Sequence, residues 1–182
     1  KVADGMTILE GTTGNDVFFG GMVASSSYTY NGLAGNDTIT STAASTQVEL
    51  HGDDGDDLIR LNSPGSAHGD AGSDLIFFTT DPSSTPAWQQ TADGGDGSDV
   101  IFYRPGSKVA ATVLGGAGAD ILVLQGSGSV TVDAGADGDF VQLGELGGTT
   151  ALQAHVVTLG AGADTLFLSG AALVSTGTAR PL

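Results

Sequence analysis

The chain has 182 residues, including 30 glycines, and its 21 acidic and 5 basic residues give a formal net charge of -16. Five cations cannot build the basic surface that nucleic acid or an anionic membrane requires, so we expect neither as a partner. Cysteine is absent, which excludes disulfides and thiolate zinc sites. No apolar run is long enough to span a membrane, and no signal-peptide pattern follows Lys1. We therefore expect a single domain that is a processed or excised segment.

One motif, Gly-x-x-Gly-x-Asp-x followed by an apolar residue, recurs eight times, as in the stretch from Gly52 to Ile59. Aspartate holds the sixth position of every copy, at Asp16, Asp37, Asp57, Asp74, Asp99, Asp120, Asp139 and Asp164. Glycine holds the fourth position of seven copies, at Gly14, Gly35, Gly55, Gly72, Gly97, Gly118 and Gly162. A period of about 20 residues is too short for a pair of helices and fits one coil of a two-stranded solenoid.

Two apolar columns flank the motif and predict a thin core between two sheets. Two positions before the loops stand Leu9, Tyr30, Leu50, Ala67, Ala92, Val113, Val132 and Val157. Two positions after the aspartates stand Phe18, Ile39, Ile59, Ile76, Ile101, Leu122, Val141 and Leu166. Because side chains alternate faces along a strand, both columns can point inward. We predict an all-β parallel β-roll, a two-sheet solenoid of about eight coils over residues 1–168, followed by a C-terminal cap or linker over 169–182.

The outward columns of the two predicted sheets differ. Before the loops the outward residues are mostly polar, with threonine at Thr29, Thr91, Thr112 and Thr131. After the aspartates they are largely apolar and include Phe19, Phe77, Phe102 and Phe167. An apolar outer face is either covered by another domain, a subunit or the far loops, or it is an exposed patch. We expect a protein partner or self-association through this face, and the alternative is a tolerated hydrophobic surface.

The motif loops carry the ligand chemistry of a hard cation. Glycines at the first and fourth positions permit unusual backbone angles that turn carbonyl groups inward, and the aspartate adds a carboxylate on the same side of each coil. Stacked aspartates about 5 Å apart repel one another without counter-ions. An all-oxygen, flexible loop suits calcium better than magnesium. The alternative is that each aspartate caps its own turn by hydrogen bonds.

These repeats resemble the glycine-rich nonapeptide of RTX (repeats-in-toxin) proteins, over about residues 11–168. The resemblance implies a parallel β-roll with Ca²⁺ between coils, held by loop carbonyls and by the eight motif aspartates, and eight loops offer at most seven such intervals. Here the motif occurs once per coil, so we expect one row of ions along one edge. The pattern is weakest where Asp137 replaces the fourth-position glycine and Leu159 the first, and strongest around Asp57, Asp74, Asp99 and Asp120.

Other chemistry is sparse. His51 and His68 precede successive loops at equivalent positions, where they are either a transition-metal pair or two solvated histidines. The threonine column is similar to flat ice- or glycan-binding faces, but Glu49 and Ser66 interrupt it, and threonine is common in strands. No histidine–acid arrangement supports nucleophilic catalysis, so we do not expect an enzyme.

We therefore expect a calcium-binding structural module of a secreted or cell-surface bacterial protein. Its folding would follow calcium binding, and its role would be assembly of a surface-layer or adhesin-like kind. The alternatives are a glycan- or ice-binding adhesin module, or the C-terminal secretion or folding module of an extracellular hydrolase or toxin, which the RTX resemblance also implies.

Overall fold

A computed structural model describes residues 6–20, 27–41, 47–78, 89–104, 110–125, 129–144 and 156–168. Within these ranges the secondary structure is made of strands alone, and no helix long and apolar enough to cross a membrane occurs in them. The strands are β1 (Met6–Glu10), β2 (Val17–Gly20), β3 (Ser27–Asn31), β4 (Thr38–Ser41), β5 (Val48–His51), β6 (Leu58–Leu61), β7 (Gly65–Ala71), β8 (Leu75–Phe78), β9 (Gln90–Asp96), β10 (Val100–Tyr103), β11 (Ala111–Ala117), β12 (Ile121–Leu124), β13 (Val130–Ala136), β14 (Phe140–Leu143), β15 (Val156–Thr158) and β16 (Thr165–Leu168). The predicted cap or linker over 169–182 lies outside the described residues.

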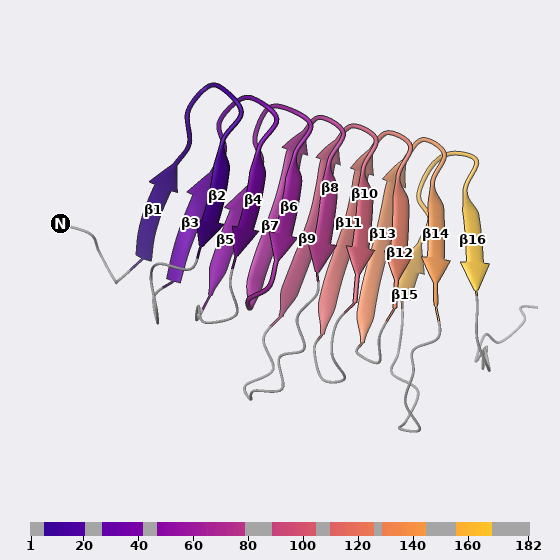
Figure 1. Cartoon of the computed structure of the whole chain (residues 1–182). Coiled ribbons are helices and arrows are strands. Elements are labelled where there is room, and N and C mark those ends of the chain that lie inside the picture. The colour runs from indigo at the N-terminus through magenta and orange to yellow at the C-terminus, as the bar shows by residue number, and fades with distance from the viewer. Residues whose placement is uncertain are drawn as a thin grey trace, which may run out of the picture.

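The strands form two parallel sheets of eight, one from the odd-numbered and one from the even-numbered strands. In each sheet, successive strands of the chain lie side by side, so every coil adds one strand to each sheet (Figure 1). This arrangement confirms the predicted all-β solenoid. The motif loops connect each odd strand to the next even strand, and they line up along one edge, at the top of Figure 1.

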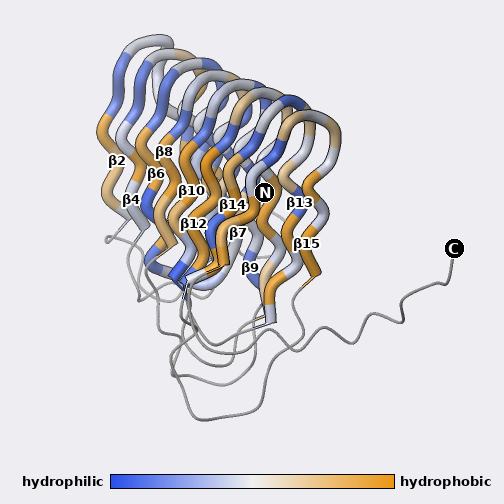
Figure 2. Tube along the Cα trace, turned by 90° about the vertical axis from the view of Figure 1, so that its right-hand side faces the viewer, coloured by the Kyte–Doolittle hydropathy of each residue, from blue (hydrophilic) through white to orange (hydrophobic). Residues whose placement is uncertain are grey.

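The motif fixes the register of both sheets. Equivalent repeat positions pair directly, as Leu50 does with Ala67 in one sheet and Ile59 with Ile76 in the other. The predicted inward columns are buried over coils two to seven, where the strand residues Ile39, Ile59, Ile76, Ile101, Leu122 and Val141 are at most 1% exposed. Figure 2 shows the apolar residues following the strands, with the hydrophilic residues more frequent toward the loop edge. The core is therefore one layer of side chains between two sheets.

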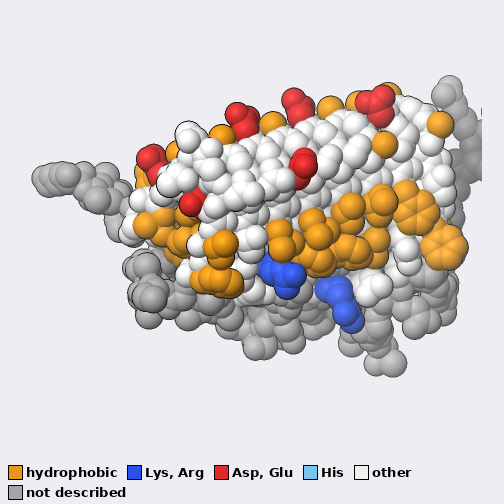
Figure 3. Space-filling model, turned by 45° about the horizontal axis from the view of Figure 1, so that its top comes forward, with side chains coloured by type: hydrophobic (Ala, Val, Ile, Leu, Met, Phe, Trp, Pro, Cys, Tyr) orange, Lys and Arg blue, Asp and Glu red, His pale blue; other side chains and the backbone are white. Residues whose placement is uncertain are grey.

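The outer face of the even-numbered sheet carries an apolar band, as the sequence predicted. Its most exposed members are Val17 at 68%, Phe19 at 64% and Phe167 at 50%. Near its middle, Phe77 and Phe102 stack with their ring centroids 5.2 Å apart, and the Arg60 guanidinium carbon lies 5.1 Å from the Phe77 ring centroid. Figure 3 shows the band running along the sheet with basic side chains at its margin. No described element packs over these exposed side chains.

Candidate calcium-binding edge

From the second copy onward, the motif loops turn through positive φ angles at their second and fourth positions. At the fourth position φ is +137° at Gly55 and +141° at Gly97, and Asp137 keeps a positive value of 77° in place of glycine. At the second position φ is 66° at Asp53 and 102° at Gly95. We expected the first-position glycines to adopt such angles, and this expectation was wrong, because none of those described has a positive φ. Among the fourth-position glycines, Gly14 also lacks a positive φ.

The first position requires glycine because other atoms occupy the space of a side chain. A methyl group on Gly52 would collide with Asp57 Oδ2 of the same loop and with the Gly69 carbonyl oxygen of the next loop. The same pair of oxygens, one from a carboxylate and one from the following coil, meets the first-position glycine at Gly11, Gly32, Gly52, Gly69, Gly94 and Gly115. We call this space, above a first-position glycine and between two coils, a cradle. Each cradle is lined by oxygen atoms of two successive coils.

The motif aspartates form a hydrogen-bonded ladder that links every coil to the next. From Asp37 onward, the Oδ1 atom accepts a bond from the backbone N–H of the preceding motif aspartate, with a donor–acceptor distance of 2.7 Å from Asp57 to Asp74 and 2.8 Å from Asp74 to Asp99. The ladder has seven steps, from Asp16 to Asp164. The structure thus brings all eight predicted aspartates together in one row. It also gives each carboxylate a role in the fold besides any ligand role.

The second carboxylate oxygen of the inner aspartates is buried and lacks a hydrogen-bond donor. This holds for Oδ2 of Asp37, Asp57, Asp74, Asp99, Asp120 and Asp139. Burial, with a smaller contribution from neighbouring carboxylates, raises the pKa of Asp74 to about 7, against a lowering by the backbone hydrogen bond to its Oδ1. Burial likewise raises the pKa of Asp57 and of Asp120 to about 6. A buried carboxylate with an open oxygen needs either a proton or a cation.

The cradle chemistry fits calcium. Its lining consists of a carboxylate Oδ2 and a backbone carbonyl oxygen, which are the oxygen donors that a hard divalent cation prefers. The three atoms nearest to a methyl group at Gly32, Gly52, Gly69 or Gly94 are oxygens and carbons, without the nitrogen or sulfur that would favour a softer metal. A cation there would face the buried Oδ2 atoms that otherwise have no partner.

The two ends of the row differ from its middle. Asp16 caps its own turn, because its Oδ2 accepts bonds from the Thr12 backbone N–H at 2.5 Å and the Thr12 hydroxyl at 2.9 Å. In the seventh copy Ala134 stands at the first position, and its buried methyl group replaces the open space. The middle five cradles combine a first-position glycine with an unpartnered Oδ2, at Asp37, Asp57, Asp74, Asp99 and Asp120.

A family model described as the RTX calcium-binding nonapeptide repeat matches the chain in four copies, with residues 3–22 matched. Together with the parallel solenoid and its row of motif loops, this match identifies the fold. The chain is an RTX β-roll. The RTX repeats make it a calcium-binding module. No curated protein and no solved structure matches the chain.

A further ladder on the outside of the RTX loops was missed by the sequence reasoning. The fifth-position side chains bridge neighbouring coils in the first half of the roll: Asn15 Oδ1 accepts the Asn36 backbone N–H at 3.0 Å, and Asp56 Oδ1 accepts that of Ser73 at 2.8 Å. The signal for it was present, since Asn or Asp occupies this position in the first three copies. These contacts support the loop stack from the solvent side, opposite the cradles.

Proposed function

We propose that the RTX loops bind Ca²⁺ in the cradles and that the bound ions drive folding of the roll. The observation that carries this proposal is the row of buried Oδ2 atoms without donors, each beside a carbonyl oxygen of the next coil. The five middle cradles are the primary sites, with ligands from Asp37, Asp57, Asp74, Asp99 and Asp120. The two end intervals, between Asp16 and Asp37 and between Asp139 and Asp164, complete the seven positions and are weaker, because Thr12 satisfies Asp16 and the seventh and eighth copies lack the first-position glycine.

Modest sites are sufficient for this role. Extracellular calcium modules bind with dissociation constants of about 0.1 to 1 mM. At calcium between one and ten times the constant, each site stabilises the fold by roughly 0.4 to 1.4 kcal/mol. Five sites then supply roughly 2 to 7 kcal/mol, which is comparable with the whole stability of a domain, about 5 to 15 kcal/mol. Calcium is thus sufficient to decide whether the roll is folded.

This energy balance favours a role outside the cell, where calcium is abundant, and RTX repeats occur in secreted bacterial proteins. The proposed module is structural and non-catalytic. The apolar band on the even-numbered sheet supports assembly, because exposed apolar side chains such as Phe19 and Phe167 gain by burial against a partner. A surface-layer or adhesin-like context would provide such a partner.

Circular dichroism tests the folding proposal. The chain should lose β signal in calcium-free buffer and recover it on addition of Ca²⁺, and an unchanged β spectrum would overturn calcium-driven folding. Sedimentation velocity in calcium tests the assembly proposal separately. A variant with Phe19→Ser and Phe167→Ser should sediment as a smaller species than the parent chain, and a parent chain that is monomeric at all concentrations refutes assembly through the band.

The threonine column is the basis of the alternative adhesin function. Thr91, Thr112 and Thr131 lie side by side in register on the odd-numbered sheet. A glycan array and an ice-shaping assay on the calcium-loaded chain distinguish this function from a purely structural one.

A further inference from the structure

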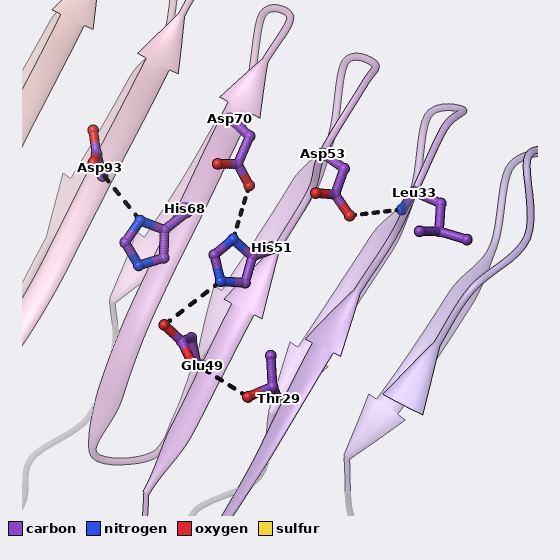
Figure 4. A network of polar contacts seen from close by, with 8 residues as sticks. All are labelled: Thr29, Leu33, Glu49, His51, Asp53, His68, Asp70 and Asp93. Carbon is purple, nitrogen blue, oxygen red and sulfur yellow. Dashed lines mark hydrogen bonds and ion pairs between the residues drawn. The ribbon is translucent and has the colours of Figure 1, made fainter. Parts of the chain in front are cut away.

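A second group of metal-ligating side chains lies on the outer face of the odd-numbered sheet, next to the motif loops but outside the cradles. Glu49 and His51 belong to β5 and His68 to β7, and the two strands pair so that His51 lies directly opposite His68. One ligand atom from each of the three residues lies within 4.8 Å of the others. Figure 4 shows the side chains converging across the strands. All three are partly exposed, so an ion can reach them from solvent.

The two imidazole rings are oriented by carboxylates behind them. They stack with centroids 4.7 Å apart and planes 8° from parallel. His51 Nδ1 lies 3.0 Å from Asp70 Oδ2, and His68 Nδ1 lies 3.7 Å from Asp93 Oδ2. At 3.0 Å the Asp70 carboxylate keeps the proton on His51 Nδ1 and leaves the lone pair on Nε2, which is the arrangement found behind metal-bound histidines, whereas Asp93 lies at ion-pair distance from His68.

The distance between the candidate ligand atoms of Glu49 and His51 suits a shared metal ion better than a direct hydrogen bond. His51 Nε2 and Glu49 Oε1 are 3.6 Å apart, which is too long for a hydrogen bond. Two ligands of a tetrahedral zinc ion with bonds of about 2.1 Å are about 3.4 Å apart. Since its ligand atom lies within 4.8 Å of the other two, His68 reaches the same ion with a side-chain shift of about 1.6 Å or less.

We propose that Glu49, His51 and His68 bind one borderline divalent transition-metal ion, of which Zn²⁺ is the representative, with a fourth position open to water. Two imidazoles and one carboxylate favour such an ion over Ca²⁺, which prefers oxygen ligands. The ion joins β5 to β7 on the outer face of the roll. This site is independent of the calcium row, because it shares no ligand with the cradles.

A second ligand set competes for His51. His51, Asp53 and Asp70 also place their ligand atoms within 4.8 Å of one another. This set offers one nitrogen and two carboxylates, and both carboxylates already make a hydrogen bond. Asp53 Oδ2 accepts the Leu33 backbone N–H at 2.9 Å, and Asp70 Oδ2 is hydrogen-bonded to His51 Nδ1 at 3.0 Å. Binding at Glu49, His51 and His68 leaves both contacts intact, so the geometry favours the first set.

Isothermal titration with Zn²⁺ tests the site on the whole chain in excess calcium, so that Ca²⁺ occupies the carboxylate loops. We expect one zinc ion per chain in the parent, and loss of this binding in His51→Gln, in His68→Gln and in Glu49→Gln. Glu10→Gln removes the same charge from the end of β1 in the same sheet and should leave the zinc affinity unchanged. Circular dichroism in calcium verifies that each variant is folded.

The orienting carboxylate provides a second, milder variant. Asp93→Asn removes the carboxylate 3.7 Å from His68 Nδ1 and should weaken zinc binding by up to about 10-fold, the lower end of the effect of losing a hydrogen-bonded partner of a metal-bound histidine. Asp133→Asn changes the equivalent residue of β13, away from the histidines, and should have no effect. Parent-like zinc affinity in His68→Gln refutes the proposal, as does zinc binding that tenfold more calcium abolishes. Loss of binding in Asp53→Asn but not in His68→Gln places the ion in the competing set.

Discussion

Filling a single cradle tests whether these spaces hold the ions. Gly94 has no positive φ, so alanine is compatible with its backbone, but the added methyl group would collide with Asp99 Oδ2 and with the Gly115 carbonyl oxygen. Gly14→Ala is the matched control, because Gly14 also has no positive φ and a methyl group there meets no atom within 4 Å. The two variants make the same chemical change in loops of the same row.

The expected cost of Gly94→Ala has two parts. Crowding of well-packed atoms costs about 1 to 3 kcal/mol. Loss of one ion costs about 1.4 kcal/mol at calcium tenfold above the dissociation constant. The total is about 2 to 4 kcal/mol in calcium, whereas Gly14→Ala should stay within about 0.5 kcal/mol of the parent chain, the usual range for exposed positions.

Urea unfolding in saturating calcium measures this difference, and equilibrium dialysis counts the ions. With a urea slope of about 2 kcal/mol per molar, Gly94→Ala should lower the unfolding midpoint by about 1 to 2 M. It should also bind one Ca²⁺ fewer than Gly14→Ala. If both variants bind the same number of ions with the same midpoint, the cradles are not the calcium sites.

Three further predictions follow from the same row. Asp99→Asn keeps an oxygen for the Asp74 backbone N–H but loses the charge, so it should bind one calcium ion fewer than the parent. Asp99→Ala also leaves that N–H without its acceptor, so its free energy of unfolding should be about 1 to 3 kcal/mol lower than that of Asp99→Asn. Equal stability of the two variants contradicts the ladder. Ala134→Gly opens the seventh cradle and should add one bound ion in a dialysis count, and an unchanged count means that its methyl group is not what limits that position. Burial raises the folded-state pKa of Asp74 to about 7, and of Asp57 and Asp120 to about 6, above the value of 3.8 for an unburied aspartate. Protonation of these carboxylates therefore stabilises the fold fully below pH 3.8, and this stabilisation is lost as the pH rises through 6 to 7. The calcium-free chain should therefore show more β signal by circular dichroism at pH 4.5 than at pH 8, and a flat profile contradicts this.

The sequence predicted the features that depend on periodicity, and these were confirmed. The inward columns at Leu50 and Ile59 follow from the alternation of strand side chains, and the register follows from one motif per coil. The row of aspartates follows from the same register. Periodicity also placed His51 opposite His68, since both precede a loop by one residue.

Features that depend on distances within one loop were not predictable. Glycine recurs at the first and fourth positions, but only the structure shows that the first serves close approach of oxygens and the fourth serves backbone angle. Thr12 is a departure from the motif in the sequence, and the structure shows that it satisfies Asp16 by hydrogen bonds. The carboxylates behind the histidines were missed because Asp70 lies two residues beyond His68 along the same strand and yet contacts His51 on the neighbouring one.

The ladder explains how a chain of net charge -16 can fold in calcium and still depend on it. Each inner carboxylate uses Oδ1 to bind the backbone of the preceding coil, so the aspartates cannot be replaced by small apolar residues without loss of inter-coil contacts. The same carboxylate leaves Oδ2 buried and without a donor. A proton and a calcium ion are then alternative occupants of one position, because each removes the penalty of a buried negative oxygen. Protons and calcium should therefore compete, so that the calcium concentration needed for binding rises as the pH falls from 8 toward 5.5, even though acid alone favours the calcium-free fold.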